Sequence, residues 1–204
     1  MDRRTTLKWV LAASAAWPLL EARSAVPAAS AASGYGSDPN LTRDYRPGEL
    51  WPLTFTEAQR RIAASLADLI IPADEHSPAA STVGVVDFID EWVSAPYPQN
   101  RRDRPVVLDG LEWLDADGTR RFGKGFALLA GAQQTRICED ICDVSRAAPA
   151  LQPAARSFAR FRDLTAGAFY SSAVGRKDLG YVGNVPLTHF DGPPAALLAK
   201  LNLP

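Results

Sequence analysis

The residues of this 204-residue chain that could carry out acid–base or nucleophilic chemistry are few and widely spaced. The chain has two histidines, His76 and His189, and two cysteines, Cys138 and Cys142. The histidines lie too far apart for the HExxH spacing of a zinc site. Two thiols are fewer than the roughly four that a cysteine-only zinc or iron–sulfur centre uses. We therefore expect no metal centre and no cofactor-binding residues in this chain.

One loop places acid–base groups next to one another, at Asp74, Glu75 and His76. A histidine next to a carboxylate is a combination that general acid–base catalysis uses. Three consecutive residues do not face one another, however, and no nucleophile accompanies them, so a solvated turn or a partner contact is favoured. His189 lies between apolar residues near the C-terminus and is interpreted as a structural or interface histidine. A small enzyme that uses His76 or His189 is the less favoured alternative, and no catalytic residue is assigned.

The two cysteines are four residues apart in a predicted helix, which places them on one face. Three interpretations stay open. They are small core residues, because cysteine is among the most buried residue types. They are a candidate disulfide, although such a bond is strained within a regular helix. They are two ligands of a metal centre between subunits.

A glycine pattern from Gly118 to Lys124 fits G-x-x-x-x-G-K, the spacing of a phosphate-binding loop. Such a loop needs Ser or Thr after the lysine and a strand before the first glycine. Gly125 follows the lysine here, and the preceding residues have helical periodicity. We expect these glycines to end a helix rather than to bind a nucleotide.

Apolar residues at helical spacing predict the elements that must position these groups. Thr56 and Gln59 form a capping-box pattern at the start of the first helix, and Pro72 follows its end. The predicted helices cover about residues 57–71, 85–94, 107–115, 132–145, 154–170 and 193–201. Residues 101–105 are predicted to be a charged surface link, and no sustained period-two alternation predicts a sheet.

The second predicted helix has an apolar stripe and a polar side. Val85, Phe88, Ile89, Trp92 and Val93 form the stripe, and we expect Asp87, Asp90 and Glu91 to be solvated. With 47% hydrophobic residues, the chain has enough apolar side chains for one core. The sequence thus predicts an all-α fold, a single compact domain of about five to six helices with an irregular C-terminal segment.

The charge balance and the first residues bear on location. A formal net charge of -1 excludes the strongly basic class of nucleic-acid-binding proteins, so no nucleic acid is expected as a partner. A charged start is followed by an apolar run of about twelve residues, too short to span a bilayer, which is typical of a secretory signal. Ala29-Ser30-Ala31 offers a cleavage site. We divide the chain into a signal peptide (1–31), a flexible leader (32–53) and a helical domain (54–204).

The export signal resembles the twin-arginine type, whose usual form is Ser/Thr-Arg-Arg-x-Phe-Leu-Lys. Arg3, Arg4, Leu7 and Lys8 match this form, whereas Asp2 and Thr6 depart from it. The resemblance implies recognition by the twin-arginine translocase, which moves folded proteins, and therefore a location in the periplasm. An ordinary secretory signal and an uncleaved membrane anchor are the alternatives.

Several stretches together resemble the gluconate 2-dehydrogenase subunit 3 family, the small subunit of sugar dehydrogenases. They are residues 69–77 (LIIPADEHS), 84–92 (GVVDFIDEW), 110–115 (GLEWLD), 161–165 (FRDLT), 169–172 (FYSS) and 180–186 (GYVGNVP). The resemblance covers about residues 54–203, and Ala79 stands where the family usually has a glycine. It implies an accessory subunit that performs no catalysis itself.

The partners that the resemblance implies are specific. The large subunit is an FAD-dependent flavoprotein of the glucose–methanol–choline oxidoreductase class that oxidises a sugar or alcohol, and a cytochrome subunit with haem c often accepts the electrons. The small subunit escorts the folded flavoprotein through twin-arginine export, stabilises it, and stays at the inner membrane through its partners. An independent periplasmic binding module is the alternative function.

We expect the partner interface to involve the irregular C-terminal segment and the leader, because exposed apolar segments need something to pack on. The alternative is that the C-terminal segment wraps the chain's own helices. Aromatic residues are the usual energetic centres of interfaces. The candidate interface residues are Trp51, Tyr170, Tyr181, Val182, Asn184, Pro186, His189 and Phe190.

Overall fold

The computed structural model describes residues 45–181, 183, 188–189 and 192–202 of the chain. The predicted signal residues Arg3, Arg4, Leu7 and Lys8 lie outside this range, and so do the candidate interface residues Val182, Asn184, Pro186 and Phe190. Within the described residues the fold is all-α and contains no strand, which confirms the predicted fold class.

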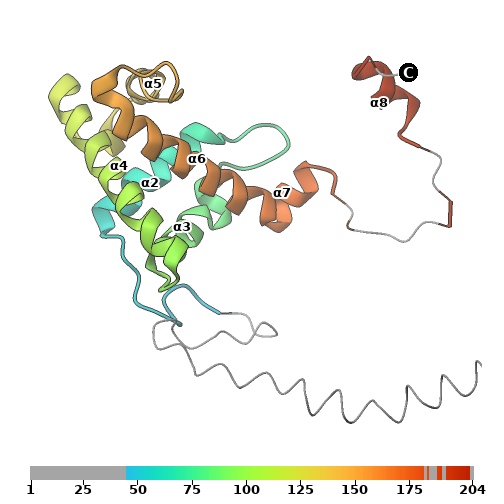
Figure 1. The fold of residues 1–204 in the computed structure, drawn as a ribbon, viewed down its shortest axis with the longest axis horizontal. Coiled ribbons are helices and arrows are strands. Elements are labelled where there is room, and N and C mark those ends of the chain that lie inside the picture. The colour runs from blue at the N-terminus through green and yellow to red at the C-terminus, as the bar shows by residue number, and fades with distance from the viewer. Residues whose placement is uncertain (1–44, 182, 184–187, 190–191, 203–204) are drawn as a thin grey trace, which may run out of the picture.

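Figure 1 shows a bundle of helices from which the C-terminal segment extends. The helices are α2 (Glu57–Ile70), α3 (Val85–Ser94), α4 (Pro98–Phe122), α5 (Gly131–Glu139), α6 (Gln152–Ser171), α7 (Ala173–Asp178) and α8 (Ala195–Lys200). Short 3-10 segments cover Ala80–Val83 (η1), Phe126–Leu128 (η2) and Pro149–Leu151 (η3). In the figure α8 lies apart from helices α2 to α7.

One hydrophobic core joins the helices of the bundle. Helices α4 and α6 make the most extensive helix–helix contact, and α2 and α3 pack against both. The largest fully buried apolar side chains come from all parts of the bundle: Leu66, Val85, Ile89, Val93, Val107, Leu111, Phe126, Ile137, Ile141 and Phe169. The apolar periodicity of the sequence therefore produces a shared interior, as expected for packed amphipathic helices.

Helix α2 begins as its sequence predicts. The Thr56 side chain accepts a hydrogen bond from the Gln59 backbone N–H at 3.2 Å, and the Gln59 side chain accepts one from the Thr56 N–H at 2.9 Å. These two bonds satisfy backbone donors that no helical carbonyl can reach. The predicted capping box is confirmed, and α2 ends at Ile70 before Pro72.

The prediction that residues 101–105 form a surface link is wrong, because they belong to the first turns of α4. Proline inside a helix removes a backbone hydrogen bond, yet α4 continues through Pro105. Its first turns are held by the end of α3. Asn100 Nδ2 donates to the Trp92 carbonyl at 2.8 Å, and Arg104 donates to the carbonyls of Val93 and Ser94. These contacts satisfy the carbonyl groups that the end of α3 leaves unpaired.

Helices α4 and α6 approach closely at Gly110. A Cβ atom added there would lie 2.6 Å from the Ser157 Cβ, so the glycine permits this crossing. Further along, Gly118 lies inside α4, and Gly123 ends it in the left-handed conformation with φ of 73°. The G-x-x-x-x-G-K pattern therefore spans the last turns of a helix and does not form a phosphate-binding loop.

Two elements in the second half of the domain differ from the prediction. Helix α5 ends at Glu139 rather than Ser145, and Asp143 caps a separate turn by accepting from Ser145 N at 2.8 Å. Helix α7 was not predicted. It starts because the Ser172 hydroxyl accepts from the Gly175 N–H at 3.0 Å, an N-cap contact that follows α6 directly.

Candidate partner-binding surface

The acid–base residues of the loop before η1 are not assembled into a site. Asp74 accepts hydrogen bonds from the backbone N–H groups of His76 and Ser77, each at 2.8 Å, and these bonds lower the pKa of its carboxyl group. The side chains of Glu75 and His76 are mostly exposed, with Oε1 and Nε2 3.7 Å apart. The arrangement is a solvated Asx-type turn.

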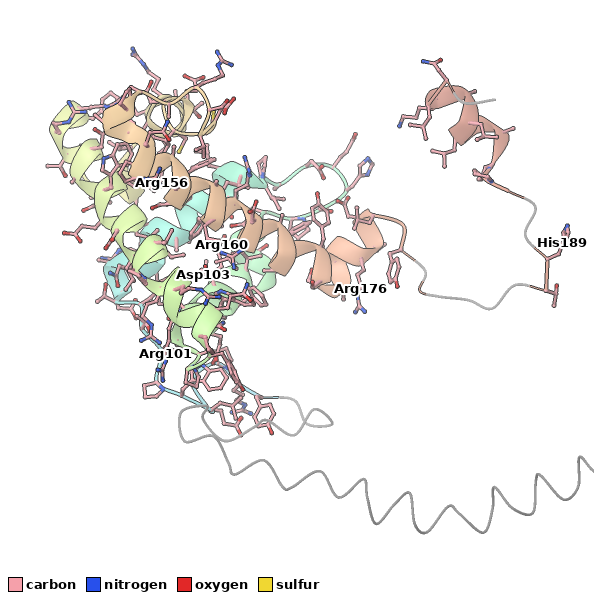
Figure 2. All side chains as sticks on the ribbon, viewed as in Figure 1. Arg101, Asp103, Arg156, Arg160, Arg176 and His189 are labelled. Carbon is pink, nitrogen blue, oxygen red and sulfur yellow. The ribbon has the colours of Figure 1, made fainter. Side chains whose placement is uncertain are left out.

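Other candidate chemical groups lie apart from this loop. His189 is exposed in the C-terminal segment, away from the bundle in Figure 2. Among the residues that the structure describes, no group of three or more His, Cys, Asp or Glu side chains is arranged to hold a metal ion. Neither His76 nor His189 therefore belongs to such a group.

The two cysteines have different environments at the end of α5. Cys138 is buried in the core, whereas Cys142 is exposed, and both are free thiols here. Burial, with a smaller contribution from Cys142, raises the pKa of the Cys138 thiol to about 12. Cys138 is thus one of the core residues that the first interpretation expected, and the disulfide stays a prediction.

The segment before α2 is bound to α3 by a buried carboxylate. Asp90 is fully buried, and its Oδ1 accepts hydrogen bonds from the N–H groups of Thr54 at 3.0 Å and Phe55 at 2.9 Å. Arg60 of α2 donates to the other oxygen at 2.8 Å. The prediction that Asp90 is solvated is wrong, because the segment before α2 and the Arg60 side chain lie against its side of α3.

Further contacts hold this segment, which we call the strap (residues 45–55), on α3. The Trp51 Nε1 donates to the Glu91 carbonyl at 3.3 Å, Gly48 N donates to the Glu91 side chain, and the Thr54 and Ser94 hydroxyls lie 2.8 Å apart. The described end of the predicted flexible leader is thus bound to the helical domain.

An aromatic patch lies beside the strap on the outer side of α3. Phe88 is 39% exposed and stacks on half-buried Trp92, with ring centroids 6.1 Å apart and an interplanar angle of 28°. Trp51 meets Tyr97 edge to face at 6.0 Å. All five apolar residues of the predicted stripe on α3 were expected to be buried. Val85, Ile89 and Val93 are, and Trp92 packs partly buried against the core, but Phe88 is exposed because the stripe is wider than one helix face can bury.

Arg160 of α6 completes this patch. Its guanidinium lies 5.5 Å from the centre of the Trp92 ring, which is cation–π geometry. Asp103 of α4 accepts from Arg160 Nη2 at 2.5 Å and from Trp92 Nε1 at 2.8 Å, and Figure 2 shows Asp103 and Arg160 close together. We call Trp51, Phe88, Trp92, Tyr97 and Arg160 the aromatic–arginine face. Of these residues, the sequence analysis named only Trp51 as a candidate interface residue. The width of the apolar stripe at residues 85–93, which exceeds what one helix face can bury, could have indicated the exposed ring of Phe88.

The C-terminal candidates that the structure describes are exposed. Tyr170 is 37% and Tyr181 56% exposed, and Tyr170 contacts the Phe169 ring edge to face at 5.2 Å. Leu179, Leu197 and Leu201 are exposed as well. Described residues of the C-terminal segment thus present apolar side chains to solvent.

No helix in the described ranges is both long and apolar enough to cross a membrane. The chain was also compared with known proteins. The sequence model of a family described as Gluconate 2-dehydrogenase subunit 3 matches residues 57–192. No curated protein and no solved structure matches the chain. The matched range includes all of helices α2 to α7, Phe88, Trp92 and Arg160.

Proposed function

Because the chain belongs to the gluconate 2-dehydrogenase subunit 3 family, we propose that it is a non-catalytic accessory subunit of an FAD-dependent sugar or alcohol dehydrogenase. The family match over residues 57–192 carries this proposal. The flavin belongs to a large subunit of the glucose–methanol–choline oxidoreductase class, and a cytochrome subunit supplies haem c where the complex has one.

The second part of the proposal is escort. The twin-arginine-like signal at Arg3 and Arg4 takes this chain, with the folded flavoprotein bound to it, through the twin-arginine translocase to the periplasm. There the complex stays at the inner membrane through its partners. A signal for folded cargo is consistent with this role, and so is a chain with few side chains capable of acid–base or nucleophilic catalysis.

The third part concerns the contact itself. Partner binding uses the aromatic–arginine face and the C-terminal segment, with Trp51, Tyr170, Tyr181, Val182, Asn184, Pro186, His189 and Phe190 as the candidate contacts. Aromatic residues and arginine supply much of the binding energy of interfaces. Exposed aromatic rings on a bundle whose core is already filled support this choice.

The experiment is co-purification from the native host. The full chain carries an affinity tag at its C-terminus, and the purified material is examined for a flavin absorption spectrum, a haem spectrum and dehydrogenase activity with an artificial electron acceptor. We expect a flavin-containing larger subunit in a fixed ratio to this chain. A colourless single chain would refute the proposal, and it would favour an independent binding module. A colourless single chain that turned over a substrate would instead support a small enzyme that uses His76 or His189.

A further inference from the structure

The backbone changes course between the two cysteines. Helix α5 ends at Glu139, and the Ile141 N–H donates to the Cys138 carbonyl at 3.1 Å in a tighter turn than the helix uses. Cys142 lies beyond this turn, at the start of the connection to η3. The strain expected of a disulfide within a regular helix therefore does not apply at this pair.

The Cys142 thiol is directed back toward the helix. Its Sγ lies 3.5 Å from the Glu139 carbonyl oxygen, so it sits over the last turn of α5, next to the residue that follows Cys138. The charge of Cys142 contributes to the raised pKa of the Cys138 thiol, so the two thiols lie near each other at this turn.

We propose that Cys138 and Cys142 form an intrachain disulfide across the C-terminal end of α5 when the folded chain meets an external disulfide. The bond closes over the end of α5, where Asp140 pairs with Arg121 of α4 at 2.7 Å. The bond also fixes the start of the connection between α5 and η3. Gln152 Nε2 holds the later part of this connection by donating to the carbonyls of Val144 and Ala147, at 2.8 and 2.9 Å.

The reaction is thiol–disulfide exchange in two steps. The exposed Cys142 thiolate attacks the external disulfide, a mixed disulfide forms, and one external thiol leaves. Cys138 then attacks the Cys142 sulfur, and the second external thiol leaves. The two cysteines lose two electrons and two protons, and the external disulfide gains them. Burial raises the pKa of Cys138 to about 12, which makes Cys142 the first nucleophile and Cys138 the slower, resolving one.

A consequence for timing rests on the proposed function. A chain that folds in the reducing cytoplasm before export keeps both thiols, and it oxidises after it reaches an oxidising compartment. The disulfide chemistry itself does not depend on export or on a partner, so the two proposals can fail separately.

The test uses the full chain, purified in reductant and then incubated with oxidised glutathione. After denaturation and alkylation, mass spectrometry counts the remaining thiols. We expect no alkylation and a mass about 2 Da below that of the reduced chain, which is the loss of two hydrogens. The Cys138→Ser variant is expected to stop as a glutathione adduct at Cys142. The Cys142→Ser variant, with only the buried thiol, is expected to form no adduct.

Three outcomes would overturn the proposal. They are a wild-type chain that keeps two alkylatable thiols, one that stops as a glutathione adduct, and one that forms covalent dimers. Because Cys138 is buried, Cys138→Ser could unfold the domain. The variant Cys138→Ala, checked by its helical circular dichroism, then replaces it. The wild-type mass alone decides whether the bond forms.

Discussion

Two glycines inside long helices show how a single residue depends on its surroundings. A Cβ atom at Gly110 of α4 would lie 2.6 Å from Ser157 Cβ, whereas one at Gly167 of α6 would meet nothing within 4 Å. Alanine stabilises a helix interior relative to glycine by about 0.5–1 kcal/mol when nothing opposes it. At Gly110 the close crossing of α4 and α6 opposes this stabilisation, because the added methyl group would meet Ser157.

We therefore predict opposite signs for the same substitution. Gly167→Ala is expected to raise the free energy of unfolding by about 0.5–1 kcal/mol. Gly110→Ala is expected to lower it by about 1–3 kcal/mol, because the added methyl group overpacks the crossing. Urea unfolding of both variants measures the difference. Stabilisation by Gly110→Ala would show that the two helices separate without cost.

The buried carboxylate of Asp90 joins the strap, α2 and α3. Asp90→Ala would leave the backbone N–H groups of Thr54 and Phe55 without their acceptor, and Arg60 would keep only its ion pair with Asp87. Removing one partner of a buried pair costs about 3 kcal/mol or more. We predict that loss for Asp90→Ala in urea unfolding, and a change below about 0.5 kcal/mol for the control Asp109→Ala, an exposed carboxylate on α4. An equal effect of both substitutions would contradict the role of Asp90.

The buried thiol of Cys138 predicts a pH dependence of stability. Burial raises the pKa of this thiol from its ordinary value of 9.0 to about 12 in the folded chain. Between these values the unfolded chain binds fewer protons at this site than the folded chain does. The free energy of unfolding should therefore fall as pH rises from about 9 to 12. Urea unfolding in reductant, compared with Cys138→Ala, isolates this slope. Identical slopes for the two chains would contradict the prediction.

At the scale of the elements, α3 has two roles. Its inner face carries Val85, Ile89 and Val93 into the core, whereas Phe88 is exposed to solvent and Trp92 is half-buried beside it. Helices α4 and α6 fix the outer face through Asp103 and Arg160. Because three helices hold these rings, the aromatic–arginine face is preformed, which lowers the entropy lost on binding.

This arrangement predicts that a charge at Phe88 weakens partner binding without unfolding the chain. We expect Phe88→Asp to reduce recovery of the flavoprotein in co-purification by about tenfold or more, as for an interface hot spot. The control is Leu128→Asp on η2, whose side chain is 73% exposed at another site. Circular dichroism verifies that both variants stay helical. Equal recovery with both variants would place the partner contact elsewhere.

At the scale of the whole molecule, the strap lies between the predicted signal peptide and the helical domain in the sequence. Residues 45–55 are bound to α3, so the predicted export signal precedes a segment that is part of the folded bundle. An escort needs this linkage, because the signal must travel with the folded domain and its cargo.

We predict that the paired arginines of the signal decide where the flavoprotein is found. Replacing Arg3 and Arg4 by lysine is expected to leave most of the large subunit in the cytoplasm, because a receptor reads this pair. Cell fractionation with a flavin assay measures the outcome. The control replaces the adjacent pair Arg101 and Arg102 of α4 by lysine. Normal periplasmic flavoprotein in the Arg3 and Arg4 variant would refute the escort role.

Much of the local structure followed from short stretches of sequence. The cap at Thr56, the bounds of α3 and the end of α2 before Pro72 depend on neighbouring residues, and all were predictable. The family was predictable as well, because its motifs are spread over most of the domain. The cap and the helix bounds depend on residues close together in the sequence, and the family motifs match known patterns. Neither requires knowledge of which distant residues meet in space.

Only the tertiary structure decided which polar and aromatic side chains are buried. Asp90 and Asp87 look alike in the sequence, and Arg60 pairs with both, but only Asp90 also binds the backbone of the strap and is fully buried. Phe88 looks like a core residue until Ile89 and Val93 fill the core. Residues 101–105 look like a link until their side chains bind the end of α3. For Asp90 the deciding partners are 30 to 36 residues away along the chain. For Phe88 the decision depends on which side of α3 the rest of the bundle covers, and that too is settled only in space.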